Sequence, residues 1–158
     1  MVMYQFGSSR NYADGPTSLP SNSNDPNLDW GPSAQDVVDR YLADVRLIRA
    51  AAAEYGVWVL FVWQPIINYK ESLTDGEMGI IDQTEQDMPG FFEQYLEVDA
   101  LLRQRVSEEN FTDFLVLSDL FSNDTRPLFY DKVHITENGN YTVARAILPE
   151  ILKRLFPQ

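Results

Sequence analysis

Asp131 and His134 are the two residues whose types and spacing are best suited to chemistry. His134 is the only histidine of the chain, and it lies in the stretch Phe129-Tyr-Asp-Lys-Val-His-Ile-Thr-Glu-Asn-Gly-Asn140. In a turn, an aspartate three residues before a histidine can fold back so that its carboxylate accepts the Nδ1 proton of the imidazole. Nε2 is then free to act as a base. The alternative interpretation is a surface histidine beside a helix start, without a chemical role.

A helix that begins just after His134 is expected to hold this turn in place. Thr136 is a suitable N-cap, and Glu137 suits the positive end of the helix dipole. Apolar residues then recur at helical spacing and predict the face that packs inward: Tyr141, Ala144, Ile147, Leu148, Ile151 and Leu155. His134 is therefore predicted to lie on a loop pinned by a packed helix, where functional groups are commonly held.

The motif Asp-x-x-His, followed by Ile-Thr-x-x-Gly-Asn and a closing amphipathic helix, resembles the last conserved block of the SGNH (GDSL-type) hydrolases. The resemblance extends upstream to the apolar segment that ends in Trp63-Gln64-Pro65 and to the loop that begins at Ile66. It implies a serine ester hydrolase in which His134 is general base and acid and Asp131 orients it. Expected substrates are acetylated carbohydrates or other small acyl esters, and no cofactor is implied.

The family's nucleophile block, Gly-Asp-Ser, is not found in this sequence. One alignment makes Val2–Phe6 the family's third strand and assigns Asn11 to the oxyanion hole, so that the strand bearing the nucleophile is missing. The other treats Phe6-Gly-Ser-Ser9 as a degenerate nucleophile block, with Ser9 as the nucleophile and Ser8 in place of the usual Asp. The first alignment is favoured, and it predicts an N-terminally truncated domain.

Two further expectations follow from the missing block. Without a neighbouring first strand, Val2–Phe6 would form an exposed apolar edge through which the chain aggregates or dimerises. A different class of protein also remains open, namely a non-catalytic domain that keeps the fold and binds a glycan or a protein partner.

The remaining pattern predicts one α/β domain over residues 1–158. Ser33 is expected to cap a helix that runs to about Tyr55 and ends at Gly56. Val57–Trp63 is continuously apolar, which is typical of a central strand covered on both faces. Trp58 and Trp63 are expected to be core residues, although Trp63, at the strand end, can reach a bound acyl group.

Residues 64–88 are predicted to be irregular and to form a substrate-shaping loop. A helix from Pro89 to about Ser107 and a second buried strand, Phe114–Leu117, are expected to follow. Alternation of strands and helices predicts a three-layer α/β/α sandwich with at least three parallel strands. The resemblance implies the flavodoxin-like SGNH version of this fold, with Asp131 and His134 beyond the carboxyl ends of the strands.

The amino-acid composition argues against several kinds of binding partner and site. The net charge of −12 and the pI near 4.3 oppose binding to nucleic acid or to an anionic membrane. Without cysteine the chain has no disulfide, thiolate metal site or Cys nucleophile. No apolar run is long enough to span a membrane, and the N-terminus lacks the pattern of a signal peptide. The acidic residues between Glu71 and Asp87 have no histidine among them, and no metal site is expected there.

Overall fold

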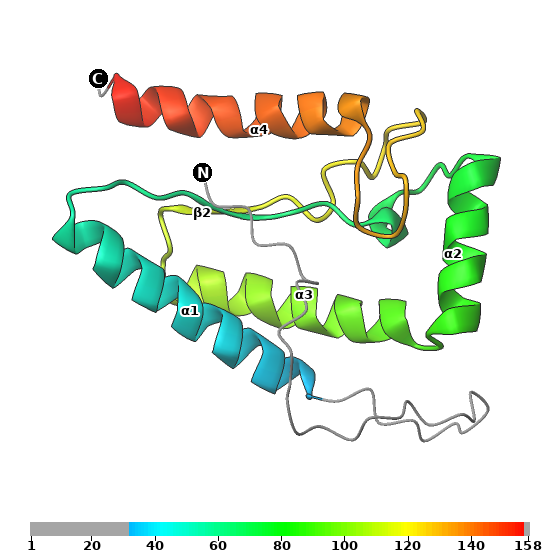
Figure 1. Cartoon of the computed structure of the whole chain (residues 1–158), viewed down its shortest axis with the longest axis horizontal. Helices are drawn as coiled ribbons and strands as arrows, with labels where there is room; N and C mark the ends of the chain where they lie inside the picture. Colours follow the sequence, from blue (N-terminus) through cyan, green and yellow to red (C-terminus); the bar gives the residue numbers. More distant parts are fainter. Residues whose placement is uncertain (1–31, 157–158) are drawn as a thin grey trace.

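A computed structural model describes residues 32–156 of the chain. This part is a mixed α/β structure with four α-helices, one short 3₁₀ helix and a small parallel sheet of two strands (Figure 1). In chain order the elements are α1 (Ala34–Glu54), β1 (Phe61–Trp63), η1 (Ile67–Tyr69), α2 (Asp75–Asp87), α3 (Phe91–Glu108), β2 (Phe114–Val116) and α4 (Glu137–Leu155).

Helix α1 begins and ends as its sequence predicts. The Ser33 hydroxyl accepts the backbone N–H of Asp36, and the Asp36 carboxylate accepts that of Ser33, which together form a capping box. Gly56, with φ of 63°, follows the last turn in the left-handed conformation that glycine adopts without strain. The helix buries Val38, Leu42 and Val45.

The predicted strand over 57–63 is shorter than expected. Only Phe61–Trp63 pairs, and its partner is β2, in the parallel register that sets Phe61 opposite Phe114 and Trp63 opposite Val116. Val57 is 57% exposed and Trp58 is 39% exposed, so the expectation that this whole segment is buried was wrong. The first bond of Phe61 is from its N–H to the carbonyl of Asp113, the residue just before β2.

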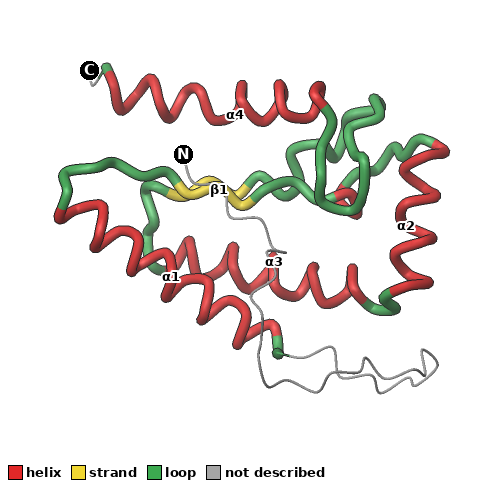
Figure 2. The backbone as a smooth tube through the Cα atoms, viewed as in Figure 1, coloured by secondary structure: helices red, strands yellow, loops and turns green. Residues whose placement is uncertain are grey.

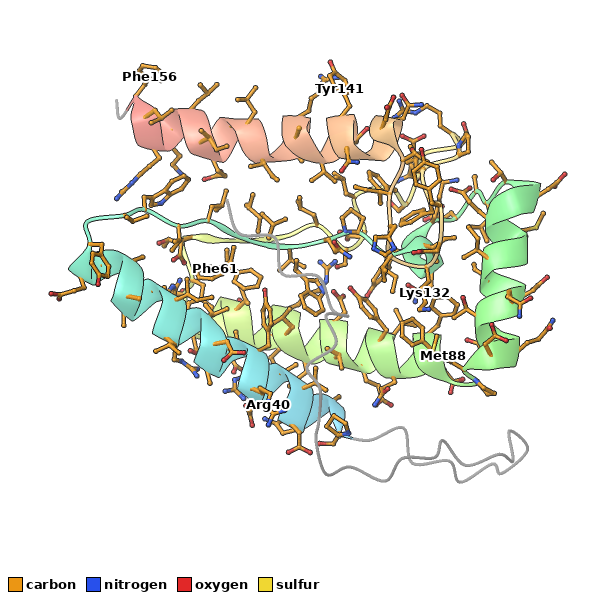
Figure 3. All side chains as sticks on the ribbon, viewed as in Figure 1. Arg40, Phe61, Met88, Lys132, Tyr141 and Phe156 are labelled. Carbon is orange, nitrogen blue, oxygen red and sulfur yellow. The ribbon has the colours of Figure 1, made fainter. Side chains whose placement is uncertain are left out.

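Helices lie on both sides of the two strands. Figures 1 and 2 show α4 on one side and α1 with α3 on the other, while α2 stands at the end of the sheet. Successive strand residues point to opposite faces. Accordingly Phe61 and Trp63 join the core under α1 and α3, while Val62 packs against the core on the other side. In Figure 3 the labelled Phe61 side chain points toward the α1 and α3 layer.

Two core clusters result. The first contains Val38, Leu42, Val45, Phe61, Trp63, Val98, Leu102 and Phe114. The second, which surrounds the segment before α4, contains Ile66, Ile67, Phe92, Phe121, Leu128, Phe129, Val143 and Ile147. Val2–Phe6, the predicted third strand and dimerising edge, lies outside the described residues.

The prediction that residues 64–88 are irregular was wrong, because Asp75–Asp87 forms α2. The signal for it was present in Thr74-Asp-Gly-Glu77, a capping box in which the Thr74 hydroxyl and the Glu77 side chain bond each other's backbone N–H groups. Two glycines inside the helix obscured the pattern. The next helix also starts later than predicted, at Phe91, because Gly90 with φ of 80° precedes it.

Helix α4 starts where predicted, and the Thr136 hydroxyl accepts the N–H of Gly139. Its buried residues are Gly139, Val143 and Ile147. Of the predicted inward face, Ile147 is confirmed and Ile151 packs, partly buried, against the core. Tyr141, Leu148 and Leu155 are exposed, and Figure 3 shows Tyr141 pointing away from the sheet. The helix is apolar on more than one side, so sequence spacing did not decide which side packs.

Candidate active site

Asp131 and His134 are in direct contact. One carboxylate oxygen of Asp131, Oδ2, lies 2.6 Å from Nδ1 of His134. The other oxygen, Oδ1, accepts the backbone N–H groups of Val133 at 2.9 Å and His134 at 2.7 Å. The carboxylate is therefore held by the turn it helps to form, and the carboxylate–imidazole contact expected from the sequence is present.

Antiparallel backbone contacts close this turn. Phe129 and Ile135 form an isolated antiparallel bridge, and the Tyr130 N–H donates to the carbonyl of His134 at 2.8 Å. One step further out, the Thr136 N–H donates to the carbonyl of Leu128, also at 2.8 Å. Phe129 and Leu128 are buried, so the base of the turn belongs to the core while its tip reaches solvent.

The electrostatics favour a charged Asp131. Partial burial alone would raise the pKa of this carboxyl, but the hydrogen bonds from the His134 side chain and from the two backbone N–H groups outweigh it and lower the pKa. The side chains of His134 and Asp131 are 55% and 51% exposed. An ionised Asp131 favours the tautomer of His134 with its proton on Nδ1, which leaves the lone pair on Nε2.

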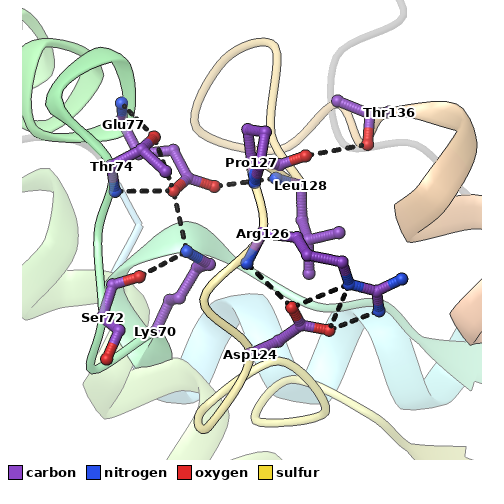
Figure 4. Close-up of polar contacts among 9 residues, drawn as sticks. All are labelled: Lys70, Ser72, Thr74, Glu77, Asp124, Arg126, Pro127, Leu128 and Thr136. Carbon is purple, nitrogen blue, oxygen red and sulfur yellow. Dashed lines mark hydrogen bonds and ion pairs between the residues drawn. The ribbon is translucent and has the colours of Figure 1, made fainter.

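The group that anchors this turn to the rest of the chain was not among the predicted site residues. Glu77, on α2, is 1% exposed; its Oε1 accepts the N–H of Leu128 at 2.9 Å and its Oε2 lies 2.8 Å from Nζ of Lys70. Lys70 is also buried and donates to the carbonyl of Ser72. Figure 4 shows Glu77 between Lys70, Thr74 and Leu128. The capping box between Thr74 and Glu77 was visible in the sequence and could have identified Glu77.

A second set of polar contacts ties the same segment to α4. The Thr136 hydroxyl donates to the carbonyl of Pro127 at 3.3 Å (Figure 4). Arg126 pairs with Asp124 and also reaches the Thr142 hydroxyl on α4 at 3.3 Å. Anchors on α2 and α4 thus hold the segment that leads into Asp131 and His134.

Asp99 organises a buried network at the carboxyl end of β1. Its carboxylate accepts hydrogen bonds from Trp63 Nε1 at 2.9 Å, the Tyr69 hydroxyl at 2.6 Å and Arg103 Nε at 2.8 Å. Arg103 also donates to the buried Ser118 just after β2. Trp63 is therefore a core residue, as predicted, with 5% of its surface exposed.

A pocket of about 380 Å³ adjoins the Asp131 side of the turn. Here called the α2 pocket, it is lined by Gly76, Gly79, Ile80, Gln83, Thr84, Asp87, Met88, Asp131 and Lys132. In Figure 3 the labelled Lys132 and Met88 lie near each other beside α2. The segment predicted as a substrate-shaping loop is thus a helix, and it contributes most of a pocket next to the candidate dyad.

The other predicted site residues, Ser9 and Asn11, lie outside the described residues, as does Ser8. Within residues 32–156, no hydroxyl group is hydrogen-bonded to Nε2 of His134. The same part of the chain contains no group of three or more His, Asp or Glu side chains arranged to hold a metal ion. None of its helices has the length and apolar character needed to cross a membrane.

Comparisons of the chain with protein-family models, with curated proteins and with solved structures found no match.

Proposed function

We propose that the chain is an SGNH-type serine ester hydrolase domain in which His134 is the general base and acid and Asp131 orients it. The observation that carries the proposal is the 2.6 Å contact between Nδ1 of His134 and a carboxylate whose other oxygen is occupied by two backbone N–H groups. In a serine triad the orienting aspartate likewise accepts the Nδ1 proton of the histidine.

The location of the dyad supports the same proposal. Asp131 and His134 follow the carboxyl end of β2, and open α/β folds bind ligands outside the carboxyl ends of parallel strands. Helices on both sides of β1 and β2 support the finer proposal of a three-layer α/β/α sandwich of the SGNH type (Figure 1).

In the proposed reaction, Nε2 of His134 accepts the proton of a serine hydroxyl as its oxygen attacks the ester carbonyl. The imidazolium, stabilised by Asp131, then gives that proton to the departing alkoxide, leaving an acyl-serine. Water deprotonated by the same nitrogen releases the acid and restores the serine. The nucleophile is proposed to be a serine outside residues 32–156. The two alignments differ on it: Ser9 is the candidate where Phe6–Ser9 forms the nucleophile block, and Asn11 is the candidate oxyanion donor where that block is not in this sequence.

A fluorophosphonate that reacts with activated serines tests the proposal, with intact mass and peptide mapping as the readout. If Ser9 is the nucleophile, the folded chain should be labelled at Ser9, whereas the heat-unfolded chain and His134→Ala should not be labelled. Asp131→Asn should slow ester turnover by up to about 10⁴-fold, because the imidazole then holds the wrong tautomer. Asp82→Asn is the matched control, since it removes an exposed aspartate from α2 that lies outside the α2 pocket.

Near-full turnover or labelling in His134→Ala would contradict the assignment. Absence of any serine adduct on the folded chain would contradict Ser9 as the nucleophile. Two interpretations would then stand: a hydrolase domain whose nucleophile block is not in this sequence, and a domain that binds a glycan or a protein partner.

A further inference from the structure

We infer that Gln64 positions the Asp131–His134 pair, by holding the peptide group between Val133 and His134 in the orientation that the pair requires. Gln64 directly follows β1, and its Nε2 lies 3.4 Å from the carbonyl oxygen of Val133. This inference deepens the proposed function and rests on it for its meaning in catalysis, because Gln64 acts only through His134. The contacts themselves can be tested without a substrate.

The peptide group between Val133 and His134 is held on both sides. Its N–H, which belongs to His134, donates to Oδ1 of Asp131 at 2.7 Å. Its carbonyl, which belongs to Val133, accepts the amide of Gln64. The two groups lie in one plane and point in opposite directions, so a donor that fixes the carbonyl also aims the N–H at Asp131. Gln64 thereby helps to keep the carboxylate in place, with Oδ2 at Nδ1 of His134.

The preceding peptide group is held in the same manner, but by the main chain. The carbonyl of Lys132 accepts the N–H of Ile67 at 3.5 Å, while the N–H of Val133 donates to Oδ1 of Asp131 at 2.9 Å. Both peptide groups between Asp131 and His134 are thus aligned by the segment that follows β1. Gln64 supplies the part of this support that comes from a side chain, and a substitution can remove it.

The end of the sheet gives Gln64 a defined position. The carbonyl of Trp63 and the N–H of Ile66 both bond to the main chain just after β2, at 2.9 Å and 3.3 Å. Between them, Pro65 limits the rotation of the backbone, and Ile66 is 1% exposed. The sheet therefore sets where the Gln64 amide lies, and through it the orientation of the turn.

The nitrogen NMR spectrum of the imidazole tests the inference in the isotope-labelled full chain. His134 is the only histidine, so the signals of Nδ1 and Nε2 belong to it alone. In the neutral imidazole, the contact with Asp131 places the proton on Nδ1. Gln64→Met keeps a side chain of similar length without a donor. It should lower the ratio of the Nδ1–H to the Nε2–H tautomer by about two- to tenfold, as expected for the loss of one hydrogen bond.

Gln104→Met is the matched control, because it removes the hydrogen bond of another glutamine amide, which donates to Glu108 within α3. It should leave the tautomer ratio unchanged. Gln64→Asn is a second test at the same position, since it keeps the amide on a side chain that is one methylene shorter and cannot reach Val133. It should lower the ratio as Gln64→Met does. Amide spectra show whether each variant is folded.

An unchanged tautomer ratio in the two Gln64 variants would overturn the inference and leave the hydrolase proposal standing. This holds even if they unfold at a lower temperature, because a purely structural role does not change the tautomer of the folded chain. An equal change in Gln104→Met would also overturn it. Conversely, a lower ratio in the Gln64 variants, together with full ester turnover in His134→Ala, would confirm the positioning role and contradict the proposed function.

Discussion

The Glu77 carboxylate on α2 accepts the backbone N–H of Leu128 at 2.9 Å, across a separation of 51 residues. The carbonyl of Leu128 in turn accepts the N–H of Thr136, the N-cap of α4. One buried side chain thus links the start of α2 to the base of the turn that carries Asp131 and His134.

We expect Glu77→Gln to lower the free energy of unfolding by about 3 kcal/mol, because it leaves the buried Lys70 ammonium without its anionic partner. Urea denaturation measures the change. Glu71→Gln, at an exposed position beside Lys70, should change stability by no more than about 0.5 kcal/mol. Equal effects of the two substitutions would show that the Glu77 contacts do not stabilise the fold.

Stability should fall with acidification partly through Glu77. Burial alone would raise the pKa of this carboxyl, but hydrogen bonds from Lys70, Thr74 and Leu128 outweigh it and lower the pKa below its ordinary value of 4.5. A lowered folded-state pKa stabilises the protein above the ordinary value, and that contribution is lost as the pH falls through the folded-state pKa. The gap in unfolding free energy between wild type and Glu77→Gln should therefore be smaller at about pH 3 than at about pH 7. A constant gap would contradict this assignment.

Replacing Gly139 and Gly79 by alanine should have opposite effects on stability. At Gly139 a Cβ would lie 2.9 Å from Cβ of Ile135 and 3.1 Å from the carbonyl oxygen of Leu128, so Gly139→Ala should destabilise the protein by about 1–3 kcal/mol. At Gly79 the added Cβ meets nothing, and Gly79→Ala should stabilise α2 by about 0.5–1 kcal/mol. Thermal unfolding of both variants checks the signs. A stabilising Gly139→Ala would contradict the close packing of α4 against the turn, and a destabilising Gly79→Ala would contradict the open space at that position.

Removal of the Asp99 carboxylate should destabilise the fold, because Asp99 accepts hydrogen bonds from three buried or partly buried donors. These are the groups on Trp63, Tyr69 and Arg103. Asp99→Ala should lower the unfolding free energy by about 3 kcal/mol or more, as measured by urea denaturation. Asp44→Ala, at an exposed position on α1, is the control and should change stability by no more than about 0.5 kcal/mol.

Local features were predictable from the sequence. The Ser33 and Thr136 caps and the fold-back of Asp131 onto His134 all join residues within a few positions of each other. Side chains of such residues reach one another once the backbone turns, whatever the rest of the chain does. The burial of Phe61 and Phe114 was also predicted, from two short apolar runs, although Val57 and Trp58 of the first run are exposed.

Tertiary structure alone decided which side of α4 packs, how far β1 extends and where α2 stands. These outcomes depend on partners distant in sequence: the strand register between Phe61 and Phe114, the bond from Leu128 to Glu77, and the approach of Lys132 to α2. Apolar spacing shows that a segment can be buried but not what it meets, because the hydrophobic effect has no direction. The sequence by itself therefore determined the Asp131–His134 turn, while the buried anchor and the adjoining pocket exist only once the helices are packed.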